Sequence, residues 1–262
     1  MIASLGAVRP IDDMDMTDIA AVFTDIDDTL TWHGALVPEA YGAIVRLVDA
    51  GVPVGLATGR AGGFAEVLAL MWPVTFAVAE NGGYAVLRNG EARYWDPPDL
   101  RLAQRNQLDA LITAAAAELP AIRLATDSGL RRVDIAWDLH EHADVGPDDS
   151  ERLAALCHRH GARTLTSSIH LHACCGDHDK ASMLLRLAGE QLDLDHVEAT
   201  ARCVFVGDSP NDQAGFATFP RSVGVANVTS HADRLTPPPA FVTSRPGGFG
   251  FAELADRILA AR

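Results

Sequence analysis

Short apolar runs alternate with helix-like segments along the first eighty residues, and this alternation restricts the fold more than any other feature of the chain. The apolar runs occupy residues 19–24, 52–57 and 76–79. The segments with helical spacing lie between them, at residues 38–50 and 61–71. A short, continuous apolar run is typical of a strand buried on both faces. Strand, helix, strand, helix, strand predicts βαβ units and a parallel sheet.

The middle of the chain has a different pattern. Residues 84–87 and 92–95 flank Asn89-Gly90, which is a hairpin signal. Helical segments are expected at 100–119 and 148–160, and strand-like segments at 122–126, 132–139 and 164–173. Hairpins, alternating strands and helices together predict an α+β region whose sheet is at least partly antiparallel.

The parallel pattern resumes after this region. A predicted helix at 180–192 is followed by strand-like runs at 203–206, 222–226 and 241–243, and by a last helix at 249–261. We therefore predict an α/β main domain formed by residues 1–80 and 180–262, interrupted by an inserted α+β domain at residues 81–179.

The formal net charge of −14 limits the partners of the chain. A global negative field repels nucleic acid and anionic membrane surfaces. It also repels an anionic substrate, so a phosphate site must be built from local cations, backbone N–H groups or a bound metal. No apolar stretch approaches the roughly 20 residues that span a bilayer, and no basic start precedes an apolar segment. We expect a cytoplasmic protein.

Cys157, His158 and His160 suggest a metal site by composition alone. They fall on a predicted helix without a second ligand pair at zinc spacing, which disfavours this interpretation. The four cysteines form no CxxC pair, so reduced thiols are expected rather than a disulfide framework.

Three carboxylates follow the first predicted strand directly, at Asp25, Asp27 and Asp28. Like charges this close repel one another, and a strand end tolerates them most easily if a cation is bound there. A capped acidic loop is the structural alternative, and it would be favoured for an isolated pair. The apolar strand before the loop and Thr29-Leu30 after it favour the cation site.

Three further polar clusters follow predicted strands or begin a predicted helix: Thr58-Gly59-Arg60, Lys180, and Gly207-Asp208-Ser209-Pro210-Asn211-Asp212. Thr58 can simply cap the next helix, and Lys180 can be solvated. A lysine in a first helical turn opposes the helix dipole, however, unless it shares an anion with the helix N-terminus. Ser209 and Asp212 fit a capping box, which leaves Asp208 unexplained. Because the carboxyl ends of parallel strands meet at one edge, these clusters are expected at one site.

In this order and placement, the clusters resemble the four motifs of the haloacid dehalogenase (HAD) superfamily. Asp25-Ile26-Asp27-Asp28-Thr29 is similar to its DxDx[TV] loop and Gly207 to Asp212 to its GDxxxD loop, while Thr58 and Lys180 match its Thr and Lys. Asp28 stands where many members have Gly, but that position is not a fixed letter of the motif. The resemblance covers nearly the whole chain.

The inserted domain lies between the second and third motifs, which resembles the type II cap arrangement. Its strand and helix content, and Ala79-Glu80-Asn81-Gly82-Gly83 at its entry, are similar to the IIB branch. That branch includes Cof-like hydrolases, sugar-phosphate phosphatases and phosphomannomutases. The resemblance therefore implies a Rossmann-like parallel-sheet domain with an inserted α+β cap of type C2B.

The resemblance also implies a magnesium-dependent phosphatase for a small phosphate monoester, such as a sugar or polyol phosphate. Asp25 would form an aspartyl phosphate, and Asp27 would be the general acid and base. The phosphate would be bound by Thr58, Gly59, Arg60, Lys180 and Asn211. Mg²⁺ would be held by Asp25, the backbone carbonyl of Asp27, Asp208 and Asp212, with Asp212 also orienting Lys180.

Three alternatives stay open at this point. A phosphomutase would use the same nucleophile, and the sequence does not separate the two reactions. A phospho-receiver module also has strand-end acids, a Thr and a Lys, but it is shorter and has no inserted domain. A non-catalytic phospho-binding scaffold is disfavoured because every motif residue is present.

The leaving group would be contacted by the cap, and the candidate residues are Arg131, Arg132, His170, His172 and His178. Each can equally be a side chain on the exposed face of a half-buried strand. The expected partner is a small phosphorylated metabolite rather than nucleic acid or a membrane. The sequence indicates no oligomeric state.

Overall fold

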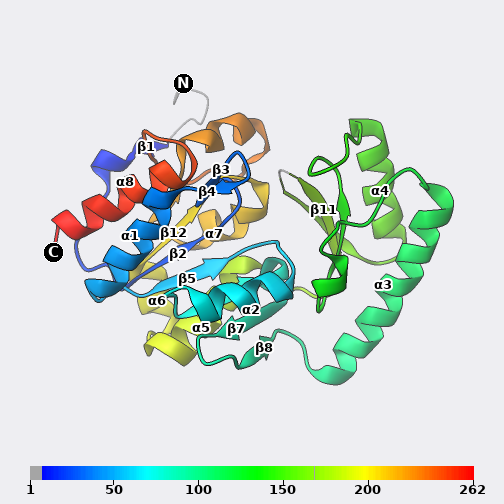
Figure 1. The fold of residues 1–262 in the computed structure, drawn as a ribbon, viewed down its shortest axis with the longest axis horizontal. Coiled ribbons are helices and arrows are strands. Elements are labelled where there is room, and N and C mark those ends of the chain that lie inside the picture. The colour runs from blue at the N-terminus through cyan, green and yellow to red at the C-terminus, as the bar shows by residue number, and fades with distance from the viewer. Residues whose placement is uncertain (1–7, 168) are drawn as a thin grey trace.

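The computed structural model describes residues 8–167 and 169–262, which form a large and a small body joined side by side (Figure 1). The large body contains a nine-stranded sheet. In sheet order its strands are β1 (Arg9–Pro10), β14 (Phe241–Val242), β13 (Ser222–Gly224), β12 (Cys203–Gly207), β2 (Ala21–Thr24), β5 (Val54–Ala57), β6 (Phe76–Ala79), β7 (Tyr84–Leu87) and β8 (Ala92–Tyr94). Neighbouring strands are parallel from β1 to β6, which confirms the predicted parallel sheet.

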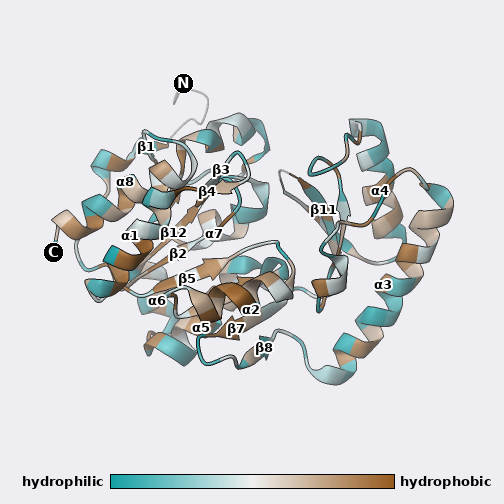
Figure 2. Cartoon of the chain, in the orientation of Figure 1, coloured by the Kyte–Doolittle hydropathy of each residue, from teal (hydrophilic) through white to brown (hydrophobic). Residues whose placement is uncertain are grey.

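Helices cover both faces of this sheet because its strands are apolar on both sides. On β2, Val22 packs into one hydrophobic cluster while Ala21 and Phe23 pack into the other. The first cluster includes α1 (Pro38–Asp49), α2 (Gly62–Met71) and α8 (Gly247–Ala260). The second includes α5 (Lys180–Leu192), α6 (His196–Arg202) and α7 (Gln213–Thr218). Figure 2 shows the apolar strands enclosed by these helices, of which α2 is largely apolar and exposes Val67, Leu70 and Met71.

The hairpin β7–β8 was predicted to belong to the inserted domain, and the structure corrects this. β7 pairs antiparallel with β6 and β8 pairs with β7, so both strands extend the large sheet. The reason is that β6 would otherwise be the edge strand of the sheet. Without a partner, the outer backbone N–H and C=O groups of this buried strand would be unsatisfied. We propose that the inserted domain spans residues 95–179, and we call this part the cap and the rest the main domain.

The cap has an antiparallel sheet in the order β10 (Arg163–Thr166), β11 (His170–Cys174) and β9 (Ile135–Asp138). Two helices, α3 (Pro98–Glu118) and α4 (Pro147–Arg159), share a separate hydrophobic cluster with this sheet. Alternation along β11 decides what faces the main domain. Leu171 and Ala173 join the cap cluster, so His170 and His172 lie on the opposite face, where each is only 2% exposed.

Two predicted strands of the cap differ from the structure. The expected strand at 164–173 is broken into the hairpin β10–β11, and the Oγ of Ser167 accepts a hydrogen bond from the His170 N–H at 3.0 Å in the turn. Residues 122–126 form no strand, and only Leu124 bridges to Trp137. No helix among the described residues is both long and apolar enough to cross a membrane.

Candidate active site

Four loops follow strands that are neighbours in the large sheet, β12, β2, β5 and β6, and all four leave the same edge. Asp208 follows β12, Asp25 follows β2, Thr58 follows β5 and Asn81 lies just after β6. This edge faces the cap sheet (Figure 1). The parallel topology therefore brings together side chains that are far apart in the sequence.

Lys180 is the centre of a buried cluster at this edge. Its Nζ donates to Oδ1 of Asp25 and to Oδ1 of Asp212, both at 2.7 Å, and its side chain is fully buried. It begins helix α5, whose N-cap is Asp179. Lys180 is also the only lysine of the chain, in which every other basic residue except histidine is an arginine.

Asp208 and Asp212 are held in place by hydrogen bonds from several directions. Asp208 accepts from Thr29 Oγ1 at 3.0 Å and from Asn227 Nδ2 at 3.1 Å. The second oxygen of Asp212 accepts from the backbone N–H groups of Asp208 and Ser209 at 3.0 and 3.2 Å. The two carboxylates are therefore fixed before any ligand arrives.

The cluster contains more negative charge than Lys180 can balance. Burial, together with the carboxylates of Asp212 and Asp27, raises the pKa of Asp25 to about 8, although Lys180 acts in the opposite direction. Burial and the neighbouring carboxylates also raise the pKa of Asp208 well above its usual range. Burial alone would lower the pKa of Lys180, but the two aspartates raise it, so this side chain stays a cation.

The donor set fits a hard divalent cation. Asp25, Asp208 and Asp212 are buried, and one carboxylate oxygen of each lies within 4.8 Å of those of the others. Within residues 8–167 and 169–262, this is the one group of three or more acidic, His or Cys side chains close enough to share an ion. Carboxylate oxygens suit Mg²⁺, and a divalent cation would relieve the repulsion that raises the two pKa values.

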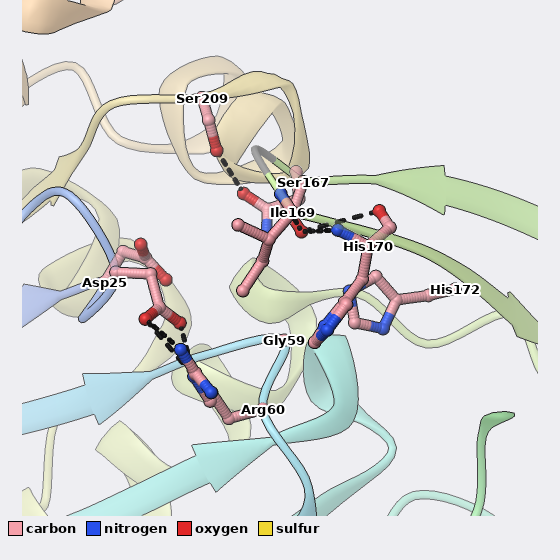
Figure 3. A pocket seen from close by; sticks show the side chains of 10 residues that line it. Asp25, Gly59, Arg60, Ser167, Ile169, His170, His172 and Ser209 are labelled. Atoms are coloured by element: carbon pink, nitrogen blue, oxygen red, sulfur yellow. Dashed lines mark hydrogen bonds and ion pairs between the residues drawn. The ribbon is translucent and has the colours of Figure 1, made fainter. Parts of the chain in front are cut away.

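Asp27 does not direct its carboxylate into this cluster. Its two oxygens accept from Nε and Nη2 of Arg60 at 2.8 to 3.2 Å, and Nη1 of Arg60 donates to Glu141 of the cap at 3.0 Å. Glu141 in turn lies 3.0 Å from Nε2 of His170. The Arg60 side chain thus bridges main domain and cap. Figure 3 shows Arg60 beside Asp25.

A small cavity separates these groups from the cap. From the main domain it is lined by Asp25, Asp27, Gly59, Arg60, Ser209 and Asn211, and from the cap by Ser167, Ile169, His170 and His172. Figure 3 shows the two histidines reaching toward Gly59 and Arg60 from the cap. Burial lowers the pKa of both histidines, which favours neutral rings.

Thr58, Asn211 and Arg131 have protein partners of their own. Thr58 is fully buried, and its Oγ1 accepts from the Arg60 N–H at 3.0 Å, as a turn or cap residue would. Asn211 lines the cavity with its Oδ1 bonded to Ser209. Arg131 is buried behind His172 between Asp127 and Asp134.

Two of the five cap residues predicted to contact the leaving group lie away from the cavity beside Asp25. Arg132 is partly exposed and ion-paired with Glu66, and His178 is buried against Gly83 and Gly176. Neither lines the cavity beside Asp25. Of the predicted leaving-group contacts, the structure places only His170 and His172 at that cavity.

Sequence reasoning missed Glu141 and Asn227. Glu141 lies in the loop after β9 and reaches Arg60 only through the packing of the cap. Asn227 lies in a 3-10 helix, Ala226–Arg234, that follows β13. Its Nδ2 donates to Asp208 and to the Asp28 carbonyl oxygen, and its Oδ1 accepts from the Gly247 N–H. No local pattern distinguishes either residue from an ordinary surface polar residue.

Comparisons with known proteins identify similar sequences over almost the full chain. A family profile described as haloacid dehalogenase-like hydrolase matches residues 22–106. A phosphoglycolate phosphatase from Pyrobaculum neutrophilum is 30% identical over 239 residues, which cover 90% of this chain and 93% of that protein.

Solved structures share the fold at low sequence identity. A protein from Thermoplasma acidophilum superposes with a TM-score of 0.74 at 18% identity, covering 92% of this chain and 98% of its own. A HAD/COF-like hydrolase from Plasmodium vivax has a TM-score of 0.70 at 17% identity, covering 100% and 99%. A sucrose-phosphatase from Synechocystis, solved with sucrose and phosphate, has a TM-score of 0.66 at 16% identity, covering 92% and 98%.

Proposed function

The chain belongs to the haloacid dehalogenase-like hydrolases, and we propose that it is a magnesium-dependent phosphatase that hydrolyses small phosphate monoesters through an aspartyl phosphate on Asp25. The observation that carries this proposal is the buried cluster in which Lys180 pairs with Asp25 and Asp212 beside Asp208. Relatives named as phosphatases support hydrolysis of phosphoric monoesters as the reaction class.

Asp25 is suited to be the nucleophile because only one of its oxygens is engaged. Lys180 holds Oδ1, while the carboxyl group also lines the cavity toward the cap. In our proposal, the free oxygen attacks phosphorus and the bond to the leaving oxygen breaks, which gives an aspartyl phosphate and an alcohol. Attack of water then releases inorganic phosphate and regenerates Asp25.

Asp27 would protonate the leaving oxygen and later take a proton from the attacking water. Both of its oxygens are bonded to Arg60 in this structure. Arg60 therefore has to release at least one of them when the substrate enters. A phosphate group offers Arg60 a second anionic partner, so the same guanidinium can turn from Asp27 toward the phosphoryl oxygens.

Mg²⁺ would be held by Asp25, Asp208 and Asp212, with the backbone carbonyl of Asp27 as the fourth predicted ligand. When bound, it supplies the positive charge that lets an anionic nucleophile approach an anionic phosphate. Lys180, at the N-terminus of α5, would stabilise charge that develops on the phosphoryl oxygens. The motif residues Thr58, Gly59 and Asn211 would complete the phosphate site.

The substrate is expected to be small, because the cap closes over Asp25 and leaves only a narrow cavity there. A sugar or polyol phosphate is the class proposed from the sequence. The name of the 30% identical relative adds phosphoglycolate, a small phosphorylated acid, as a second candidate. The cytoplasmic location inferred from the sequence stays a prediction.

The test begins with the purified protein, p-nitrophenyl phosphate and Mg²⁺, followed by phosphoglycolate and a panel of sugar and polyol phosphates. Release of inorganic phosphate is expected, and isomerisation of a sugar phosphate without release would indicate a phosphomutase instead. With methanol as a competing acceptor, every substrate should give the same ratio of methyl phosphate to phosphate, since all share one aspartyl phosphate. A ratio that changes with the leaving group would contradict the common intermediate.

A further inference from the structure

The turn that follows β6 has an unusual backbone conformation. Glu80, Asn81 and Gly82 are consecutive residues with positive φ, at 49°, 55° and 108°. Positive φ costs free energy for residues other than glycine and persists only where the surroundings hold it. Here the surroundings do so, because the buried Glu80 carboxylate accepts from the N–H groups of Gly62, Arg132, Val133 and Asp134 at 2.6 to 2.9 Å.

The side chain of Asn81 is buried without hydrogen-bond partners. Asn81 is 2% exposed, and neither its Oδ1 nor its Nδ2 has a partner among the described residues. Leaving a buried amide unsatisfied costs stability, because its donor and acceptor lose their hydrogen bonds to water without replacement. A protein rarely keeps such a group unless something outside the chain satisfies it.

Asn81 lies next to the cavity that contains Asp25. A Cβ atom on Gly59 would come within 3.1 Å of Asn81 Oδ1 and 3.2 Å of His172 Nε2. Gly59 and His172 both line that cavity, and Figure 3 shows them side by side. The amide of Asn81 and the ring of His172 therefore both lie next to the space that a side chain at position 59 would fill.

On its other side Asn81 lines a larger cavity between main domain and cap, with a volume of about 470 Å³. Lys180, Arg163 and Asn211 also line it together with Asp179, so two of its three charged side chains are cations. The turn packs against the residue before Lys180, because a Cβ on Gly82 would lie 2.1 Å from the carbonyl oxygen of Asp179. Donors around a cavity favour a ligand that offers oxygen acceptors.

We propose that Asn81 is a substrate-binding residue whose Nδ2 donates a hydrogen bond to an oxygen of the bound phosphate ester. The inference rests on the proposed phosphatase function and adds a residue from a fourth loop to its site. The oxygen belongs either to the phosphoryl group or to a hydroxyl or carboxyl group of the leaving alcohol. Both are acceptors that would satisfy the buried amide, and kinetics separate them.

The main variant is Asn81→Gly, because glycine suits the positive φ and removes only the amide. Asp193→Gly is the matched control, since Asp193 has the same φ of 55° at the end of α5, in a C-cap position away from the site. Asn81→Asp is a second variant that keeps the shape and replaces the donor with an acceptor. It remains informative if Asn81→Gly, which places three glycines in a row before Tyr84, prevents the protein from folding well.

The measurements are kcat and KM for the best ester found and the inhibition constant of inorganic phosphate. A phosphoryl contact predicts that both KM and the inhibition constant rise by about 10- to 100-fold in Asn81→Gly, since a hydrogen bond to a charged group is lost. A leaving-group contact predicts a rise in KM of about 3- to 10-fold with an unchanged inhibition constant. Asp193→Gly should leave both constants unchanged.

The inference is overturned if Asn81→Gly and Asn81→Asp fold with wild-type KM and wild-type phosphate inhibition, because the amide would then only hold a water molecule or the turn. Failure of the proposed function looks different, since the wild type itself would release no phosphate. In that case calorimetric titration of inorganic phosphate and of phosphoglycolate into wild type and Asn81→Gly still tests the contact. Equal affinities for both ligands in the two proteins would refute it.

Discussion

Main domain and cap each contain a buried cation between two aspartates, and the two clusters differ in their charge balance. In the main domain, Lys180 pairs with Asp25 and Asp212. In the cap, Arg131 pairs with Asp127 at 2.9 Å and with Asp134 at 2.8 Å. Both cations have fully buried side chains, so burial alone does not distinguish a structural cluster from a catalytic one.

The difference lies in the number of carboxylates and in the direction of their pKa shifts. A third carboxylate, Asp208, joins the Lys180 cluster, and the pKa of Asp25 is raised to about 8. Burial alone would raise the pKa of Asp134 too, but Arg131 overcomes this and lowers it. The cap cluster thus has two carboxylates for one cation and keeps Asp134 ionised, whereas the Lys180 cluster has three carboxylates for one cation and could hold a metal ion.

The Arg131 cluster holds the two bodies together. Arg131 Nη1 donates to the carbonyl oxygen of Gly59 at 3.2 Å, and Asp127 accepts from the Ala61 N–H at 3.3 Å. Both contacts reach the loop that carries Thr58 and Arg60. We infer that the cap cluster positions this loop, while the Lys180 cluster performs the chemistry, and the following predictions test that division.

The largest effect is expected from Asp25→Asn, which removes the nucleophile and should lower turnover by about 10⁴-fold or more. The folded structure should persist, because the amide has nearly the same shape. Asp28→Asn in the same loop is the control and should keep most of the activity, since the Asp28 carboxylate lies outside the cluster. Comparable activity in the two purified variants would refute the assignment of Asp25.

Removal of divalent metal with EDTA should abolish turnover, and added Mg²⁺ should restore it. The reason is the excess of negative charge around Lys180, which a phosphate cannot approach unaided. Mg²⁺ should also raise the melting temperature of the wild type but not that of Asp208→Asn. Full activity in metal-free buffer would show that the cluster acts without a cation.

Lys180→Ala should lower kcat by about 10²- to 10³-fold, because one preorganised charge of the transition state is lost. It should also destabilise the metal-free protein by about 3–5 kcal/mol, since it leaves buried carboxylates unpaired. Lys180→Arg should not restore full activity, because a planar fork does not replace a compact ammonium group. Near-normal kcat in Lys180→Ala would remove Lys180 from the mechanism.

Arg131→Met should destabilise the protein about as much as Lys180→Ala but should lower kcat far less, because Arg131 does not line the cavity beside Asp25. Loss of the guanidinium leaves Asp127 and Asp134 buried without their cation and should cost about 3–5 kcal/mol of unfolding free energy. The neighbouring variant Arg132→Met is the control, because its ion pair with Glu66 is more than one third exposed on both sides and should contribute at most about 1 kcal/mol. Denaturant unfolding measures both. If Arg131→Met lost kcat as severely as Lys180→Ala while staying stable, the division between the clusters would be wrong.

The smallest effect concerns pH and has opposite signs in the two regions. Asp25 keeps its proton in the folded, metal-free protein up to a pKa of about 8 and loses it near 3.8 when unfolded, so stability falls as pH rises toward 8. Burial raises the pKa of Glu80 to about 8 as well, with the same sign. The pKa values of His170 and His172 are lowered by burial, so stability falls as pH drops below about 6.5.

Melting temperatures measured in EDTA should therefore fall between about pH 5 and 8 and level off above pH 8, because the raised pKa values of Asp25, Asp208 and Glu80 outweigh the opposite effect of the two histidines. Asp25→Asn and Mg²⁺ should each make this fall shallower, since the first removes the titrating group and the second favours the ionised carboxylates. His172→Gln should make the fall steeper below about pH 6.5. A fall that Asp25→Asn and Mg²⁺ both leave unchanged would place its origin outside the Lys180 cluster.

The sequence determined most of the main domain and the chemical identity of its cluster. Apolar runs and helical spacing record which faces of an element are buried, and that information is local. It sufficed to predict the parallel sheet and to place Asp25, Thr58, Lys180 and Asp208 at strand ends or at a helix start. Since parallel strands end at one edge, their convergence followed without knowledge of side-chain contacts.

Only the tertiary structure decided what these residues touch. The partner of Arg60 is Asp27, 33 positions away, and the Glu141 that completes the bridge comes from the cap. The hairpin β7–β8 joined the main sheet because the edge of β6 needed a partner, and an alternating pattern in β11 could not show which body its histidines would face. Periodicity reports that a face is buried, but the groups packed against it depend on elements distant in sequence. This is why the unpartnered amide of Asn81 could be recognised only in the folded chain.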